Sequence, residues 1–152
     1  MQDRFRFRAW DKNNKRMLYN IENAYDFGGV EDEKGNEVED CYADCFSSFL
    51  PYDEEDENEK FVVEQCTGLR DKNGRLIYEG DILSTSNKDH QHDIWEPEDW
   101  GYTFIYWNEK NLCFAGTKWF IDGPEEESVF NAEFVEIVGN IHENPELLEE
   151  LK

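Results

Sequence analysis

A run of closely spaced turns and short strands over residues 67–83 limits the fold of this chain more than any other feature. Asp71–Gly74 is typical of a tight turn, because the Asn-Gly dipeptide tolerates positive φ at both central positions. The apolar Leu76–Tyr78 predicts a short strand, Glu79–Asp81 a second break, and Ile82–Leu83 the start of another strand. Small SH3-like barrels often use a Gly-Asp corner before an apolar pair. This stretch therefore predicts a small β-barrel, but it indicates no chemistry.

The first residues predict a hairpin with arginines on one face. Three apolar residues alternate with three arginines before Trp10, as in a half-buried strand with an apolar inner face and an arginine row outside. The apolar residues are Phe5, Phe7 and Ala9, and the arginines are Arg4, Arg6 and Arg8. Asn13 and Asn14 predict the turn, and residues 15–19 the second arm.

The rest of the chain adds strands and one helix. Residues 102–107 and 112–116 predict a hairpin, and residues 134–138 predict a last strand. Asn144 and Pro145 are typical of a helix start, and leucines give that helix an apolar face. Aromatic residues make up 15% of the chain, which supplies bulk for a core and favours strands. The expected fold is mainly β: an SH3-like or partly open small β-barrel built from hairpins, with a short C-terminal helix.

An acidic segment, residues 31–59, interrupts the pattern of strands. It holds thirteen acidic residues and one lysine. Its densest part, residues 53–59, predicts a solvated loop, because it has little apolar surface to bury. Between the acidic stretches, residues 41–49 contain enough apolar side chains to pack as a short helix or strand. Residues 84–101 are polar and predict a second long loop.

Three blocks of this sequence resemble the YopX family of small phage and prophage proteins. The first block is Phe5–Lys12, followed closely by Met17, the second is residues 67–83, and the third is Val138–Leu148. The blocks occur in the order expected for the family and cover both ends and the middle of the chain. Residues 31–59 and the segment around 87–100 depart from the family pattern, and we interpret them as insertions.

The resemblance implies a single YopX-like domain over residues 1–152, with the acidic insertion at 31–59. Residues 1–86 and 102–152 are candidate sub-units within it. A length of 152 residues suits one domain or two very small ones. The family has no established biochemical role to carry over, so the resemblance predicts kinship and fold class rather than function.

The net charge of −22, from 37 acidic and 15 basic residues, narrows the classes of partner. It repels DNA, RNA and anionic membranes, and it favours a protein partner with a basic surface. No apolar run approaches the about 20 residues of a membrane helix, and the charged start lacks a signal-peptide core. We therefore expect a protein in the cytoplasm of a bacterial host, with its four cysteines reduced.

The acidity also suggests a function. Carboxylates at phosphate-like spacing can occupy the DNA-binding groove of a nuclease, a restriction enzyme or a repressor. We expect a non-enzymatic phage or prophage accessory protein that binds and inhibits a host factor, such as a defence protein, through this DNA-mimic-like surface. The candidate partner-binding residues are Asp53, Glu54, Glu55, Asp56, Glu57 and Glu59. An acidic surface that serves only solubility is the alternative interpretation.

The arginines near the N-terminus support a different hypothesis. Arginines two residues apart on one strand can grip phosphates bidentately, and a neighbouring tryptophan can stack on a base. A protein of this kind would sequester an anionic, nucleotide-type ligand. The candidate ligand-binding residues are Arg4, Arg6, Arg8 and Trp10. Alternatively, the arginines pair with the chain's own carboxylates, inside the protein or at a subunit interface.

Other reactive side chains carry weaker signals. His90 and His92 are candidates to share a metal ion, but a His-x-His pair alone is more typical of a polar loop. The four cysteines lack the spacing of a zinc knuckle. No nucleophile is accompanied by an activating partner, so we expect no catalytic residues and no cofactor.

Self-association is a further expectation. Exposed strand edges and abundant aromatic residues favour a homo-oligomer, in which the N-terminal strand crosses between subunits. A structural oligomer whose charges serve only solubility is therefore a third hypothesis, beside the inhibitor and the nucleotide-binding protein. Direct binding to nucleic acid or to a membrane is not expected.

Overall fold

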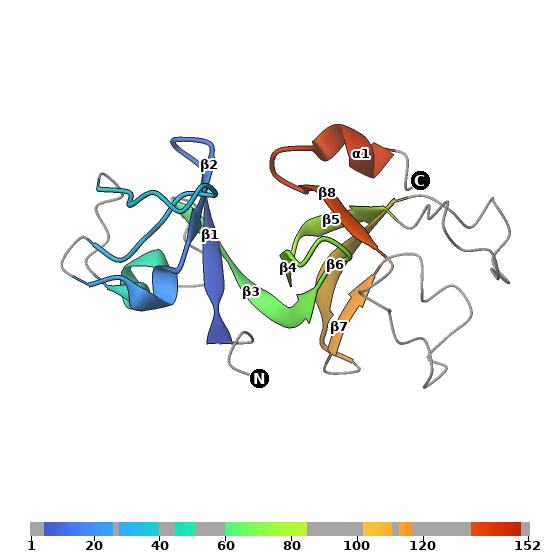
Figure 1. The fold of residues 1–152 in the computed structure, drawn as a ribbon, viewed down its shortest axis with the longest axis horizontal. Helices are drawn as coiled ribbons and strands as arrows, with labels where there is room; N and C mark the ends of the chain where they lie inside the picture. Colours follow the sequence, from blue (N-terminus) through green and yellow to red (C-terminus); the bar gives the residue numbers. More distant parts are fainter. Residues whose placement is uncertain are drawn as a thin grey trace, which may run out of the picture. The chain divides into compact units, whose positions relative to one another are not determined.

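The computed structural model describes residues 5–25, 28–39, 45–50, 60–84, 102–110, 113–116 and 135–149. The chain divides into two compact units, Met1–Cys66 and Thr67–Lys152. The elements, labelled in Figure 1, are β1 (Phe7–Asp11), β2 (Arg16–Tyr19), η2 (Ile21–Asn23), η3 (Phe46–Phe49), β3 (Phe61–Arg70), β4 (Leu76–Tyr78), β5 (Asp81–Ser84), β6 (Tyr102–Asn108), β7 (Cys113–Gly116), β8 (Glu136–Asn140) and α1 (Pro145–Glu149). Figure 1 does not label the short helical turns η2 and η3.

The mainly β fold expected from the sequence is confirmed. The described strands form two four-stranded sheets, with the orders β2-β1-β3-β4 and β7-β6-β5-β8. One of them curls as a half-barrel, in keeping with a partly open barrel (Figure 1). In the described ranges, α1 is the single α-helix, and it begins at Pro145 as predicted. Proline suits this first helical position because it needs no N–H donor there.

The first unit is built on the predicted N-terminal hairpin. β1 pairs antiparallel with β2, with Trp10 opposite Met17, and with β3, with Ala9 opposite Val63. Asp11 makes the turn, because its Oδ1 accepts the N–H groups of Asn13 and Asn14, each at 3.2 Å. One face of the sheet packs on the core of the unit. The buried members of that core are Ala9, Leu18, Ile21, Ala24, Val30, Val38 and Phe49.

The predicted alternation of an apolar inner face and an outer arginine row over residues 4–10 is wrong at two positions. Phe5, assigned to the inner face, is 71% exposed, and Arg8, assigned to the outer row, is only 2% exposed. The reason lies across the sheet, where Arg8 stands opposite Glu64 of β3 and forms an ion pair with it. An arginine that forms an ion pair can be buried. The alternation of residues along one strand does not show whether such a partner lies on the neighbouring strand. Arg6 is exposed, as expected.

The beginning of the acidic segment is part of the first unit's sheet. Tyr19 and Glu31 exchange two backbone hydrogen bonds, of 2.7 and 3.0 Å, so the chain continues the sheet beyond β2. The N–H of Val38 then donates to the carbonyl of Val30, which closes a small hairpin. Further on, η3 carries Phe49 into the core with 1% exposure. The expected short helix or strand in residues 41–49 is thus confirmed within the described residues.

The second unit contains the predicted strands of the central block and the predicted hairpin. β6 pairs antiparallel with β7, and β5 pairs antiparallel with both β6 and β8. The core of this unit consists of Ile77, Leu83, Ile105, Val135 and Ile137. The last strand was expected at residues 134–138 and is found at Glu136–Asn140, a shift of two residues towards the C-terminus.

Strand β3 belongs to both units. It runs from Phe61 to Arg70, and the boundary between the units falls between Cys66 and Thr67. Gly68 has φ +83°, a left-handed conformation that glycine adopts without a steric penalty. In Figure 1, β3 is the green strand that bends along its length. The compact units therefore divide inside a strand.

Candidate functional site

The turn from Asp71 to Arg75, the centre of the most informative sequence block, is organised by one buried carboxylate. Asp71 is 4% exposed, and its Oδ1 accepts the N–H groups of Asn73 and Arg75, each at 2.9 Å. The backbone closes the same turn, with the N–H of Gly74 donating to the carbonyl of Asp71 at 3.0 Å. Gly74 has φ +82°, whereas Asn73 does not have positive φ. The predicted tight turn is therefore confirmed, with positive φ at Gly74 and not at Asn73.

The same turn is tied to strand β8. The Oδ2 atom of Asp71 accepts the N–H of Ile137 at 3.0 Å, and the N–H of Lys72 donates to the carbonyl of Val135 at 2.9 Å. Glu136 lies between these two residues in the sequence. Its carboxylate is 3.5 Å from Lys72 Nζ and accepts a 3.3 Å hydrogen bond from Asn73 Nδ2. These polar contacts therefore join two parts of the chain that are 66 residues apart.

The Gly-Asp corner that follows is also structural. Asp81 is 2% exposed, and its Oδ2 accepts the N–H of Tyr78 at 2.8 Å. Gly80 has φ +85°, and its N–H donates to the carbonyl of Ile105 at 2.7 Å. The carbonyl of Gly80 accepts the N–H of Ile141 at 2.9 Å. This corner therefore connects β6 to the end of β8.

The closing block, which begins at Val138, forms a compact cap on β8. The Oδ1 atom of Asn140 accepts the N–H groups of His142 and Glu143, at 3.0 and 2.9 Å. Asn144 does not only begin the helix, because its Oδ1 accepts the N–H of Asn140 at 3.2 Å. A Cβ added at Gly139 would lie 2.3 Å from that Oδ1 atom, so a side chain at this position would displace Asn144. His142 thus takes part in this cap through its backbone.

The candidate arginine face is not a row of available guanidinium groups. Arg8 Nε is 2.9 Å from Glu64 Oε1, and the two side chains are 3% and 4% exposed. Arg6 is exposed and Trp10 is half-buried, whereas Arg4 lies outside the described residues. A ligand phosphate would have to replace the buried Glu64 carboxylate to reach Arg8. The prediction of a ligand site at these four residues remains a prediction.

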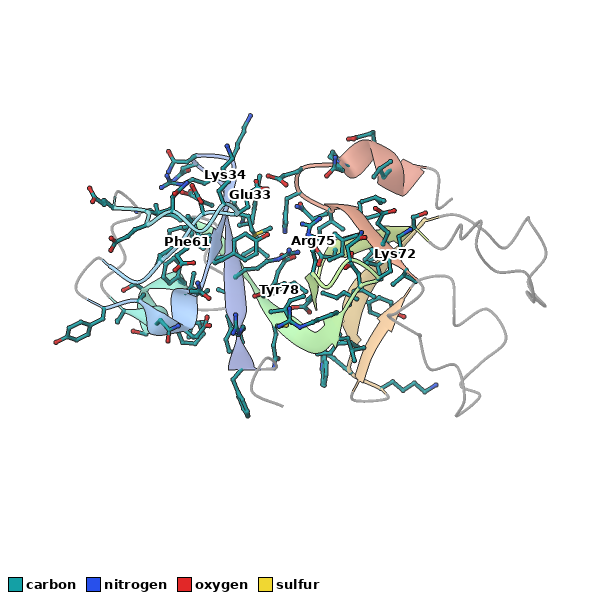
Figure 2. The ribbon with its side chains drawn as sticks, in the orientation of Figure 1. Glu33, Lys34, Phe61, Lys72, Arg75 and Tyr78 are labelled. Carbon is teal, nitrogen blue, oxygen red and sulfur yellow. The ribbon has the colours of Figure 1, made fainter. Side chains whose placement is uncertain are left out.

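The predicted acidic binding residues, Asp53, Glu54, Glu55, Asp56, Glu57 and Glu59, lie outside the described residues. An acidic surface is nevertheless present on the hairpin of residues 30–38, where the exposed side chains include Glu33 and Lys34, labelled in Figure 2. Glu31 and Glu37 are paired across this hairpin. Like charges in directly opposite positions of a sheet repel each other. The acidity of the segment is therefore carried in part by an ordered scaffold.

Asp32 makes the turn of this hairpin. Its Oδ1 accepts the N–H groups of Lys34 and Asn36, each at 2.9 Å. The hydrogen bond from the Asn36 N–H is the largest of the effects that lower the pKa of Asp32 below its ordinary value. Hydrogen bonds to a carboxylate favour its charged form. The turn thus keeps a negative charge at the tip of the hairpin.

The remaining candidates do not come together as a reactive site. His90 and His92 lie outside the described residues. Within the described ranges, no group of three or more His, Cys, Asp or Glu side chains could hold a metal ion. Cys45 is exposed and Cys66 is buried. None of the described helices has the length and apolar character needed to cross a bilayer.

Sequence reasoning missed the structural importance of two aspartates and one glutamate. Asp71 and Asp81 were placed in turns, but their burial and their bonds to other parts of the sheet were not expected. Glu64 was not singled out at all. For Asp71 a signal was available, because Asp-x-x-Gly-x occurs both at residues 32–36 and at residues 71–75. A repeated turn sequence of this kind indicates a structural requirement for the aspartate.

Comparison with known proteins places these blocks in a family. The sequence matches the model of the family described as YopX protein over residues 6–149. Among solved structures, the chain is similar to the crystal structure of protein EF1440 from Enterococcus faecalis. The two are 28% identical, with a TM-score of 0.54 over 94% of this chain and 96% of that chain. The search of curated proteins gave no match. The match covers nearly the whole chain, from β1 to the last described turn of α1, and the chain therefore belongs to the YopX family.

Proposed function

We propose that this YopX protein is a non-enzymatic phage or prophage accessory protein that binds and inhibits a host factor with a basic surface. The observation that carries the proposal is the net charge of −22. A charge of this size steers a basic partner over long distances and repels nucleic acid. The binding residues would be those at positions 53–57 and 59, with the host factor, for instance a defence protein, acting in the bacterial cytoplasm.

The ordered acidic hairpin supports this proposal. Residues 31–39 carry five carboxylates and one lysine. Two of the carboxylates, Glu31 and Glu37, stand opposite each other, and Asn20 Nδ2 donates to Glu31 at 2.9 Å. A basic partner would relieve the repulsion within such a pair. Binding would then gain from charges that the free protein leaves partly uncompensated.

The burial of Arg8 favours the inhibitor over the nucleotide-binding alternative. Removing one partner of a buried ion pair leaves the other charged group without compensation, at a cost of about 3–5 kcal/mol. A nucleotide that recruited Arg8 would leave Glu64 in that situation. The nucleotide-binding hypothesis and the structural oligomer remain alternatives, and the same experiment tests them.

The experiment compares two variants that remove the same number of negative charges from different segments of the chain. The first is E54Q/E55Q/D56N/E57Q, which neutralises the proposed surface. The matched control is D122N/E125Q/E126Q/E127Q, which also replaces one aspartate and three glutamates, so that both variants have a net charge of −18. Each tagged protein is incubated with host-cell lysate at low and at high salt, and bound proteins and small molecules are identified by mass spectrometry.

We expect the wild type and the control variant to capture the same basic protein at low salt, and the first variant to lose it. The dissociation constant measured with the purified partner should rise by about tenfold or more in the first variant and with increasing salt. Equal loss in both variants would mean that only total charge matters. A co-purified nucleotide without a protein partner would favour the arginine face, and capture of neither would favour the structural oligomer.

A further inference from the structure

Strand β8 has a backbone edge that another strand could pair with. It is the last strand of the sheet β7-β6-β5-β8, so in the described residues one of its sides faces no neighbouring strand. Residues 135–141 read Val-Glu-Ile-Val-Gly-Asn-Ile, with one charged residue among seven in a chain where 34% of residues are charged. Short segments with β-branched residues, little charge and no proline are the ones that pair readily with other chains. Val138 on this strand is 37% exposed.

The turn Asp71–Arg75 occupies the backbone groups of this edge. The N–H of Ile137 donates to Asp71 Oδ2, and the carbonyl of Val135 accepts from the N–H of Lys72. The turn also holds the one charged side chain of the segment, because Lys72 and Asn73 both contact Glu136. These contacts use one donor and one acceptor that a further strand would need.

We propose that the Asp71 turn is a guard that closes the β8 edge, and that opening the guard makes this edge a pairing site for β8 of a second copy of the chain. Two identical strands can pair antiparallel about a two-fold axis, so each edge is complementary to itself. The low charge of residues 135–141 makes this pairing compatible with a chain that is otherwise strongly acidic. This inference is independent of the proposed function, because it concerns no residue of the acidic surface.

The test uses the conservative variant D71N. An asparagine can keep the role of Oδ1 in the turn, but its amide group would present N–H donors to the N–H of Ile137. The matched control is D32N, because the bonds that Asp32 accepts come from within its own turn, at Lys34 and Asn36. The mass of each full-length variant is measured by light scattering after size exclusion, over a range of protein concentrations. Hydrogen exchange at Ile137 reports whether the edge is open.

We expect D71N to at least double the measured mass relative to the wild type and D32N at the same concentration. At protein concentrations too low for association, exchange at Ile137 should become faster by about tenfold or more, since the amide loses its acceptor. The double variant D71N/V138K should return to the wild-type mass while keeping the faster exchange at Ile137, because a lysine on the edge opposes pairing. V138K alone should have the wild-type mass.

Two results would overturn the proposal. If Ile137 exchanges faster in D71N but the mass does not increase, the edge opens without pairing. If D71N associates and V138K does not reverse it, association uses another surface. Should D71N fail to fold, K72P provides a second variant, because it removes the N–H donor to Val135 while placing proline at a turn position that accepts it. K72P should then also associate, and a K72P protein of wild-type mass would refute the proposal that this turn closes the β8 edge.

Discussion

The turns at Asp32–Asn36 and at Asp71–Arg75 have the same backbone conformation but differ in burial and in the charges around them. In each, the aspartate N–H donates to the carbonyl four residues on at 2.8 Å, and the glycine N–H donates back to the aspartate carbonyl at 3.0 Å. Gly35 and Gly74 have φ values of +83° and +82°. In each, the aspartate Oδ1 accepts two N–H groups at 2.9 Å. The same local sequence, Asp-x-x-Gly-x, thus adopts the same conformation in both places.

The difference between the two turns lies in the second carboxylate oxygen and in the neighbouring charges. Asp71 Oδ2 bonds to Ile137, which is 66 residues away, and Asp71 is buried. Asp32 is followed by Glu33 and sits at the tip of an acidic hairpin, whereas Asp71 is followed by Lys72, which pairs with Glu136. The same turn therefore serves as a tie between strands in one unit and as a carrier of surface charge in the other.

The largest expected effect is the difference between D71A and D32A. D71A removes the acceptor for three N–H groups, one of them the buried Ile137 amide, so we expect a loss of about 3 kcal/mol in the free energy of unfolding. D32A removes only bonds within an exposed turn and should be much less destabilising. Urea unfolding followed by circular dichroism measures both. Equal losses would mean that the bond to β8 contributes nothing.

G35A and G74A are expected to destabilise the protein less than D71A does, and by the same amount as each other. Both glycines have left-handed φ, and a Cβ on either would meet no atom within 4 Å, so only backbone strain opposes alanine. That strain should lower the free energy of unfolding by about 1–2 kcal/mol in each variant. The same urea titrations provide the comparison, with G35N and G74N as milder variants because asparagine tolerates this conformation better. A clear inequality between G35A and G74A would show that the turns are not equivalent in backbone energy.

The smallest effect concerns acid. The pKa of Asp32 is lowered mainly by the hydrogen bond from Asn36, so its value in the folded protein lies below that in the unfolded chain. The stabilisation of the folded state by the ionised Asp32 carboxylate is therefore complete above the ordinary pKa of 3.8. It is lost as the pH falls through the lower pKa of the folded protein. Carboxyl chemical shifts followed by NMR from pH 6 to 2 should show Asp32 titrating below an aspartate in the urea-unfolded chain, and D32N should lack this contribution. Titration of Asp32 at or above the unfolded value would contradict it.

Local patterns predicted much of the fold. Asn144 and Pro145 indicated the start of α1, and the apolar runs at residues 102–107 and 112–116 indicated the hairpin of β6 and β7. These features depend on neighbours in the sequence, which propensity and turn chemistry describe well. The three blocks that indicated the family also turn out to hold structural contacts, such as the cap formed by Asn140 and Asn144.

Contacts between distant residues could not be predicted in the same way. The burial of Arg8 depends on Glu64 in the opposite position of β3, and the role of Asp71 depends on Ile137. A single sequence contains no information on register between strands that are 56 or 66 residues apart. The interpretation of Arg8 suffered most from this limit, because its guanidinium group is paired with Glu64 of a second strand.

The position of the unit boundary inside β3 has a practical consequence for dissecting this protein. Most domains are separated by cutting in a linker, where few backbone bonds cross. Here, Phe61–Gln65 pair with β1 in the first unit, while Thr67 Oγ1 bonds to the carbonyl of Ile77 in the second. A cut at the unit boundary therefore ends both fragments in the middle of a strand, and each fragment loses part of its own sheet. Expressing either half faithfully would require overlapping fragments that both retain residues 61–70.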